Sequence, residues 1–152
     1  MRTSRVASWA GASAVILCGA LAAAHEGKSK LPPGPIHDRH ELMEEIGDHA
    51  KKIGETLKAG KTEGIGADAT VISEKAKLAL PLFPAGSLHE HSRAKPEIWQ
   101  NWAEFERLMH GLEADSAALA AAAASGGDVG AASKKMFGNC KSCHDQFRKP
   151  ED

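Results

Sequence analysis

The helical pattern of this chain is clearest in residues 36–57, IHDRHELMEEIGDHAKKIGETL. One set of residues recurs there at alternating steps of three and four, the spacing of one face of an α-helix. The set comprises Ile36, Arg39, Met43, Ile46, Ala50, Ile53 and Leu57. Every member except Arg39 is apolar, so we predict an amphipathic helix that ends at the glycine-flanked turn GKTEG, residues 60–64.

Three further stretches also predict helices. The four predicted helices cover residues 36–57, 67–80, 96–124 and 128–148. Pro81 and Pro84 stop the second helix, and Pro96 suits the first position of the third, which we expect to be continuous. No segment alternates apolar and polar residues with the period of two that strands show. The fold class is therefore predicted to be all-α, an antiparallel four-helix bundle.

The composition limits the classes of protein to which this chain can belong. The 152 residues include 19 Lys+Arg and 20 Asp+Glu, a formal net charge of -1. That length suits one domain, and the balanced charge argues against a broad basic surface for nucleic acid. Aromatic residues make up only 5% and tyrosine is absent, so the core must come from aliphatic residues, from alanine or from something not encoded in the chain.

Residues 1–24 are typical of a secretory signal peptide. Two arginines precede an apolar stretch at residues 10–21, and three alanines before His25 offer a cleavage site. The apolar stretch is shorter than the roughly 18 residues of a membrane-spanning helix. Leu17, directly before Cys18, is larger than the small residue that lipoprotein sites prefer. We predict export, cleavage and no stable membrane insertion afterwards.

Cleavage would change the length and the net charge of the chain. It would remove 24 of the 152 residues, two of the 19 basic residues and none of the 20 acidic ones, leaving 128 residues with a formal charge of -3. Residues 25–35, rich in proline and glycine, would form a lead-in, and residues 36–149 would form the bundle domain. Two cysteines would remain, Cys140 and Cys143.

The strongest chemical signal is residues 140–144, CKSCH. This is the C-x-x-C-H pattern of c-type haem attachment. Residues three apart lie on one face of a helix, so the thiols of Cys140 and Cys143 can reach both vinyl groups on one porphyrin edge. His144 follows directly and can bind the iron as proximal ligand. We predict one covalently attached haem c per chain.

Other readings of the motif are weaker. A thioredoxin-like dithiol is expected at a helix N-terminus within a βαβ unit, whereas this pair lies near the end of an all-helical chain. A structural zinc site needs four ligands, and the motif supplies three. A disulfide between Cys140 and Cys143 is compatible with an exported protein.

The sequence resembles the class II c-type cytochromes, the family of cytochrome c′ and cytochromes c-556. The residues that carry the resemblance are Arg39-x-x-x-Met43, Ile46-Gly47-x-His49, Phe83-Pro84, residues 94–99 (AKPEIW), Phe105 and Cys140-x-x-Cys143-His144-x-x-x-Arg148. They span nearly the whole mature chain. The resemblance implies a four-helix bundle with haem held between helices, in the periplasm of a Gram-negative bacterium.

The same resemblance bears on the sixth iron ligand. In this family the residue four after the first-helix arginine faces the distal side of the haem, and here that residue is Met43. A thioether bound to iron would give a six-coordinate, low-spin centre of raised potential. The alternative is that Met43 only packs over the porphyrin. Met109 is expected in the core or the haem wall, and Met136, one turn before Cys140, is poorly placed for the distal side.

Two arginines are candidate haem contacts. Arg39 interrupts an apolar seam, and a buried unpaired guanidinium is expensive, so it should either reach solvent or meet an anion. The resemblance implies that this anion is a haem propionate. Arg148 resembles the family's basic residue beside the proximal ligand, although it would also suit a helix C-terminus. The remaining histidines, among them His49 and His91, are expected to be solvated.

The function implied is that of a soluble periplasmic electron carrier with His144 and Met43 as axial ligands. No catalytic constellation is present, so we expect no enzyme. The partner would be a periplasmic redox protein rather than nucleic acid, and family members often form homodimers through their first two helices. Two alternatives stay open: a five-coordinate cytochrome c′ that binds NO or CO, and a non-haem dithiol module using Cys140 and Cys143.

Overall fold

The computed structural model of the chain describes residues 30–150. The predicted signal peptide at residues 1–24 lies outside the described residues, as do residues 25–29 of the predicted lead-in. The helices of the described part are α1 (Pro35–Lys58), α2 (Ile65–Ala79), the 3-10 helix η1 (Leu80–Leu82), α3 (Glu97–Gln100), α4 (Trp102–Ser125) and α5 (Val129–Phe147).

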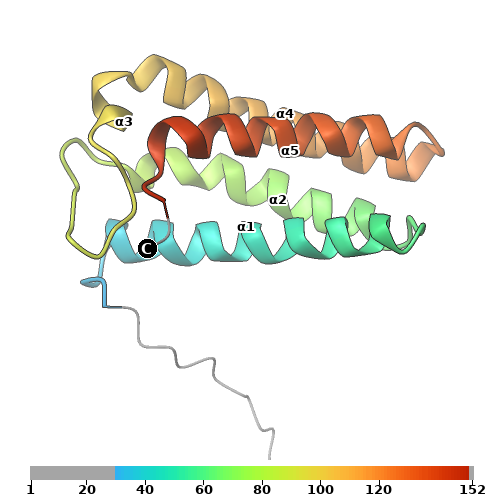
Figure 1. Ribbon diagram of the computed structural model, residues 1–152, viewed down its shortest axis with the longest axis horizontal. Helices are drawn as coiled ribbons and strands as arrows, with labels where there is room; N and C mark the ends of the chain where they lie inside the picture. Colours follow the sequence, from blue (N-terminus) through green and yellow to red (C-terminus); the bar gives the residue numbers. More distant parts are fainter. Residues whose placement is uncertain (1–29, 151–152) are drawn as a thin grey trace, which may run out of the picture.

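The four long helices run alternately in opposite directions along the bundle (Figure 1). Helix α2 packs against both α1 and α4, and α4 packs in turn against α5. The predicted antiparallel four-helix bundle is therefore confirmed. Within residues 30–150, every helix is too short or too polar to cross a membrane.

Helix α1 forms where the sequence predicts it. Pro35 supplies a suitable φ in the first turn, and the buried residues are Arg39, Leu42, Ile46 and Ile53. Leu42 lies one position off the predicted seam, yet it belongs to the core. A bundle helix contacts two neighbours, so its buried face is wider than a single line of residues. Met43 and Ala50 of the predicted seam are only partly buried.

The third helix differs from the prediction, because the chain breaks at Asn101. That residue has φ -128° and ψ 53° and separates the short α3 from α4. The break lets Trp99 donate its indole N–H to the Phe83 carbonyl at 3.1 Å. At the same time Phe105, on α4, packs edge-on against Phe83 with 4.7 Å between ring centroids. These contacts tie the loop after η1 onto the end of the bundle.

Helix α5 lies close against α4 just before the CKSCH motif. A Cβ atom on Gly111 of α4 would lie 3.0 Å from Oδ1 of Asn139, so a larger residue there would require the Asn139 side chain to shift. The Asn139 side chain donates from Nδ2 to the carbonyl of Leu108 at 2.8 Å. Since Asn139 directly precedes Cys140, this contact determines where the thiol-bearing part of α5 lies.

Candidate functional site

A cavity of about 470 Å³ lies between α1 and α5, with α4 and the loop at residues 91–94 completing its walls. This volume is in the range of pockets that hold small molecules and cofactors. All four phenylalanines of the chain line it: Phe83, Phe105, Phe137 and Phe147. The four phenylalanines thus surround one largely apolar space.

The motif residues Cys140, Cys143 and His144 all line this cavity from α5. Both thiols are free and partly buried. Burial raises the pKa of Cys140, and it raises the pKa of Cys143 to about 11, with smaller contributions from Cys140 and Glu104. A dithiol that works by redox exchange needs a lowered thiol pKa. The surroundings of the two thiols therefore argue against a thioredoxin-like redox function.

His144 is partly buried, and its pKa is lowered below the ordinary value. Burial is the main cause, followed by the positive charges of Arg148 and Arg93, while Asp145 opposes them. The neutral imidazole is the form that binds a metal. The surroundings of His144 therefore favour the ligand form of its side chain.

Met43 lines the cavity from α1, facing the helix that carries the motif. Met109, from α4, is 3% exposed and also lines the cavity, which fits its expected place in the core or haem wall. Met136 is fully buried and is not part of the cavity wall. Met43 and Met109 thus both line the cavity with His144, and Met43 is the one contributed by α1.

Arg39 also lines the cavity, and its guanidinium is buried and hydrogen-bonded to oxygen atoms of residues 82–92 rather than reaching solvent. It is 3% exposed. Nη1 donates to Ser87 Oγ at 2.6 Å and to the Leu82 carbonyl at 3.4 Å. Nη2 donates to the Ser87 carbonyl at 2.5 Å and to Ser92 Oγ at 3.3 Å. Neutral loop oxygens can satisfy a buried guanidinium, an arrangement that sequence spacing does not reveal.

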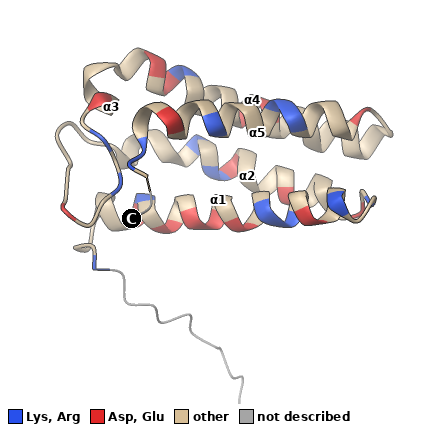
Figure 2. Cartoon of the chain, in the orientation of Figure 1, with Lys and Arg blue, Asp and Glu red and all other residues tan. Residues whose placement is uncertain are grey.

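Arg148 lies on the cavity rim at the end of α5, where the chain pairs with the loop. Ala94 and Arg148 form an isolated antiparallel bridge. The Arg93 side chain donates to the Lys149 carbonyl from Nε at 3.1 Å and from Nη2 at 2.9 Å. Basic residues thus gather where the loop meets the C-terminal segment (Figure 2). Arg93 is a cavity residue that the sequence did not single out, because its partners are distant in the chain.

Two other expectations need correction or extension. The His49 side chain is only 19% exposed and lies 2.6 Å from Asp68 Oδ1, so it links α1 to α2 rather than being solvated. Leu31, in the predicted lead-in, is buried and lines the cavity. His91 is 44% exposed at the side chain, in keeping with the prediction, although it too reaches the cavity.

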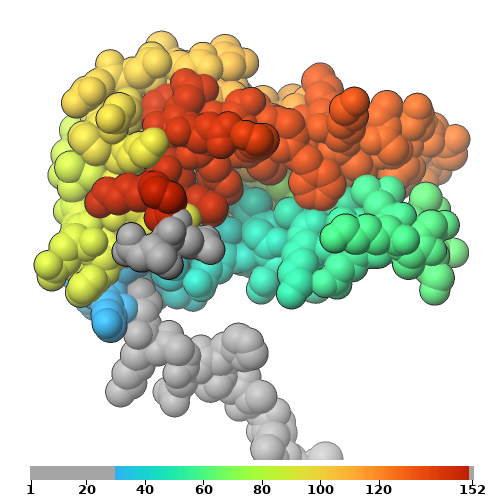
Figure 3. Space-filling model, in the orientation of Figure 1, coloured from blue at the N-terminus to red at the C-terminus, as the bar shows by residue number. Residues whose placement is uncertain are grey.

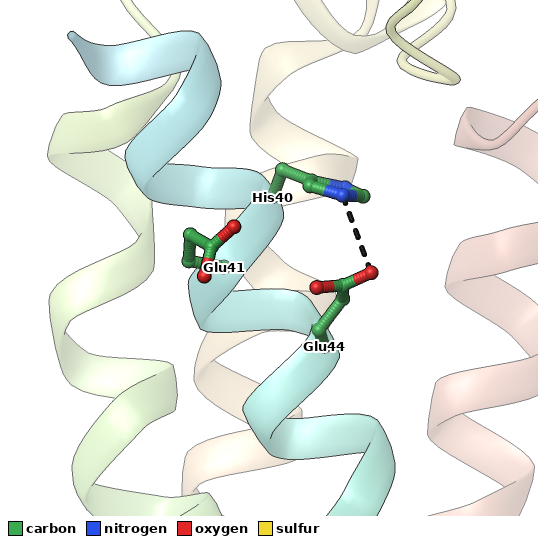
Figure 4. A group of neighbouring side chains, drawn as sticks. All are labelled: His40, Glu41 and Glu44. Atoms are coloured by element: carbon green, nitrogen blue, oxygen red, sulfur yellow. Dashed lines mark ion pairs between the residues drawn. The ribbon is translucent and has the colours of Figure 1, made fainter. Parts of the chain in front are cut away.

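One group of three possible metal ligands occurs within residues 30–150, and it lies outside the motif. His40, Glu41 and Glu44 are close together on α1 (Figure 4). His40 Nε2 lies 3.2 Å from Glu44 Oε1, an ordinary pair of residues four apart on a solvated helix. The side chains of Cys140, Cys143 and His144 are not part of such a group in the described residues.

Comparison with known proteins identifies the family. The sequence model of the family described as Cytochrome C' matches residues 34–148. The chain belongs to the cytochrome c′ family. A cytochrome c-556 from Agrobacterium tumefaciens (strain II Chrys) is 32% identical over 119 residues, covering 76% of this chain and 97% of the relative.

Other members of the cytochrome c′ family support the assignment. A cytochrome c′ from Rhodopseudomonas palustris (strain ATCC BAA-98 / CGA009) is 34% identical over 122 residues, covering 74% of this chain and 80% of the relative. The solved cytochrome c′ of Shewanella frigidimarina aligns with a TM-score of 0.71 and 29% identity, covering 76% of this chain and 94% of that one. The resemblance seen in the sequence is confirmed.

The cofactor of a cytochrome c′ family member is covalently attached haem c, as the motif predicts. The residues of this chain suit that group. Two thiols three positions apart share one face of α5, a predominantly neutral imidazole follows them, and all three line an apolar cavity. A large apolar group in the cavity would also complete a core that has few aromatic residues of its own.

Proposed function

We propose that this chain is a periplasmic electron carrier that holds one haem c, with His144 and Met43 as axial ligands. The observation that carries the proposal is the placement of these two side chains. Met43 on α1 and His144 on α5 line the same cavity from facing helices. When bound, the haem supplies an iron that alternates between the ferric and ferrous states.

The residues of the chain have separate tasks in this proposal. Cys140 and Cys143 anchor one edge of the porphyrin to α5. Met43 and His144 stay in place in both oxidation states, so that little has to move when an electron arrives or leaves. The four phenylalanines exclude water from the cavity, which strengthens every electrostatic interaction inside it.

Positive charge near His144 favours the reduced protein. Arg148 and Arg93 both act on the imidazole strongly enough to lower its pKa. The same charges disfavour the more positive ferric state, which raises the reduction potential. Arg148 thus has a role as a proximal-side residue, and Arg93 contributes in the same direction.

The second candidate is a five-coordinate cytochrome c′ in which Met43 only lines the distal side and NO or CO binds there. One observation favours it: the relatives of similar identity include a protein named cytochrome c′ at 34% as well as a cytochrome c-556 at 32%. The thioether of Met43, on three rotatable bonds, could pack without binding.

Substitution of Met43 by alanine separates the two candidates. The wild-type holoprotein should show sharp low-spin absorption bands, with a weak charge-transfer band at the red end of the ferric spectrum. Met43→Ala should abolish that band, produce high-spin features and bind CO in the ferrous state. Met136→Leu is the matched control, because Met136 is buried outside the cavity wall and the volume is kept. An unchanged spectrum in Met43→Ala would reduce Met43 to a packing residue.

The proposal also covers location and partners. Residues 1–24 would direct export, and their cleavage would leave the lead-in at residues 25–35 and the bundle at residues 36–149. The carrier would exchange electrons with a periplasmic redox protein, and it is not an enzyme. A homodimer through α1 and α2 is part of the proposal, supported by Leu78 on α2, a large apolar side chain that is 60% exposed.

A further inference from the structure

The loop at residues 83–95, here called the strap, joins two helices that otherwise face each other across the cavity. Figure 3 shows it, in yellow to yellow-green, beside the blue start of the described chain and the red end of α5. Helix α1 packs mainly on α2, and α5 packs mainly on α4. The separation of α1 and α5 at this end of the bundle therefore depends on what the strap binds.

On the α1 side the strap is held by Arg39. A guanidinium carries five N–H donors, four of them on Nη1 and Nη2. Those two nitrogens make four hydrogen bonds, to the Leu82 carbonyl, to both oxygens of Ser87 and to Ser92 Oγ. Three of these bonds go to the strap and the fourth goes to Leu82, directly before it, so only the Nε donor is left for any other acceptor.

The ring of Phe83 adds a further contact. The Arg39 Cζ atom lies 4.9 Å from the ring centroid, within the range of a cation–π interaction. Burial lowers the pKa of Arg39, but guanidinium stays charged at physiological pH. Hydrogen bonds from a charged donor are stronger than neutral ones, so this end of the strap is firmly tied.

On the α5 side the strap is held by backbone hydrogen bonds and by the side chains of Arg93, Lys95 and Lys149. The Lys95 N–H donates to the Phe147 carbonyl at 3.0 Å, and the Lys149 N–H donates to the Arg93 carbonyl at 2.8 Å. Lys149 Nζ reaches the Ser92 carbonyl at 3.2 Å. Ser92 thus receives a bond from each side, one from Arg39 and one from Lys149.

Each attachment lies one helical turn from an expected iron ligand. Arg39 is four residues before Met43 on α1, and Arg148, bridged to the strap, is four residues after His144. Residues four apart lie one above the other on a helix. A displacement of α1 at Arg39, or of α5 at Arg148, should therefore displace Met43 or His144 by a similar distance.

We propose that Arg39 is a positioning residue that ties the strap to α1 and thereby sets how closely Met43 approaches the iron, rather than serving as the counter-charge of a haem propionate. This inference rests on the proposed His144 and Met43 ligation. The two roles of Arg39 make different demands on its side chain. A counter-charge for a propionate requires only a positive charge, whereas the hydrogen bonds to the strap require the planar guanidinium group.

Arg39→Lys tests the distinction, since it keeps the charge and loses the fork. In the holoprotein we expect the ratio of five- to six-coordinate haem to rise about tenfold, a change that corresponds to about 1.4 kcal/mol. Hydrogen exchange of the backbone amides in the strap should accelerate at least tenfold. The double variant Ser87→Ala/Ser92→Ala keeps Arg39 and its charge, and should change both readouts in the same direction.

Arg107→Lys is the matched control, because Arg107 is 64% exposed and pairs with Glu104 away from the strap. It should leave the strap exchange and the spectrum unchanged. Wild-type spectrum and wild-type exchange in Arg39→Lys would overturn the inference and favour the propionate role. A wild-type protein that is five-coordinate would refute the proposed ligation instead. In that case the strap is judged by exchange and by the CO association rate, which should rise about tenfold in Arg39→Lys.

Discussion

Gly111→Ala should destabilise the bundle, although the same change inside a helix normally stabilises it. Alanine is favoured over glycine in a helix interior by about 1 kcal/mol. At Gly111 the new Cβ atom would lie 3.0 Å from Oδ1 of Asn139, tighter than nine in ten real Cβ contacts. We expect the Asn139 side chain to move away from the new methyl group and to give up its 2.8 Å hydrogen bond to the Leu108 carbonyl.

The expected magnitude follows from three contributions. Loss of a hydrogen bond costs about 1 kcal/mol, and forcing an extra methyl group into a close contact costs about 1–3 kcal/mol. Set against the gain of about 1 kcal/mol in helix propensity, the net change in the free energy of unfolding is a loss of about 1–3 kcal/mol. Because Asn139 precedes Cys140, the loss should be accompanied by a small shift in the haem absorption bands.

The assay is urea unfolding of the holoprotein, followed by the helical circular dichroism signal. Gly54→Ala is the matched control, since Gly54 lies inside α1 and a Cβ atom there would meet nothing within 4 Å. That variant should gain about 0.5–1 kcal/mol. If Gly111→Ala gained as much as Gly54→Ala, the close approach of α4 and α5 at this level would be wrong.

Two further predictions concern titration and the α1–α2 contact. In the haem-free chain the Cys143 thiol should alkylate slowly at neutral pH, because only the thiolate reacts and burial raises its pKa from 9.0 to about 11. The alkylation rate should rise until about pH 11, and a plateau near pH 9 would argue against burial of the thiol. The free energy of unfolding should fall between pH 9.0 and 11, because the Cys143 thiol loses its proton at lower pH in the unfolded chain than in the folded one. His49→Ala should lower the free energy of unfolding by about 1 kcal/mol by removing the bond to Asp68. The control His110→Ala, at a side chain 62% exposed, should change it by less than about 0.5 kcal/mol, and equal losses would contradict the role of His49.

Much of the fold could be predicted because its signals are local. The three-and-four spacing of residues 36–57 needs no knowledge of the rest of the chain, and neither does the CKSCH motif. Leu42 was missed because a single seam describes contact with one neighbour, whereas α1 has two. The break at Asn101 depends on contacts of Trp99 and Phe105 with Phe83, which no periodic pattern contains.

The parts of the site that escaped prediction depend on contacts between distant residues. Arg39 could be recognised as an interruption of an apolar seam, but its acceptors are 43 to 53 positions away. The pairing of Arg93 with Lys149 spans 56 positions. Composition pointed to a core short of aromatic residues, and only the structure shows that the four phenylalanines surround a single cavity.

The absorption spectrum of the purified holoprotein, recorded in both oxidation states, tests the central claim most directly. Ligation by His144 and Met43 predicts low-spin bands in both states and a weak charge-transfer band at the red end of the ferric spectrum. High-spin bands in both oxidation states would contradict that ligation and place the chain with the five-coordinate, gas-binding members of its family.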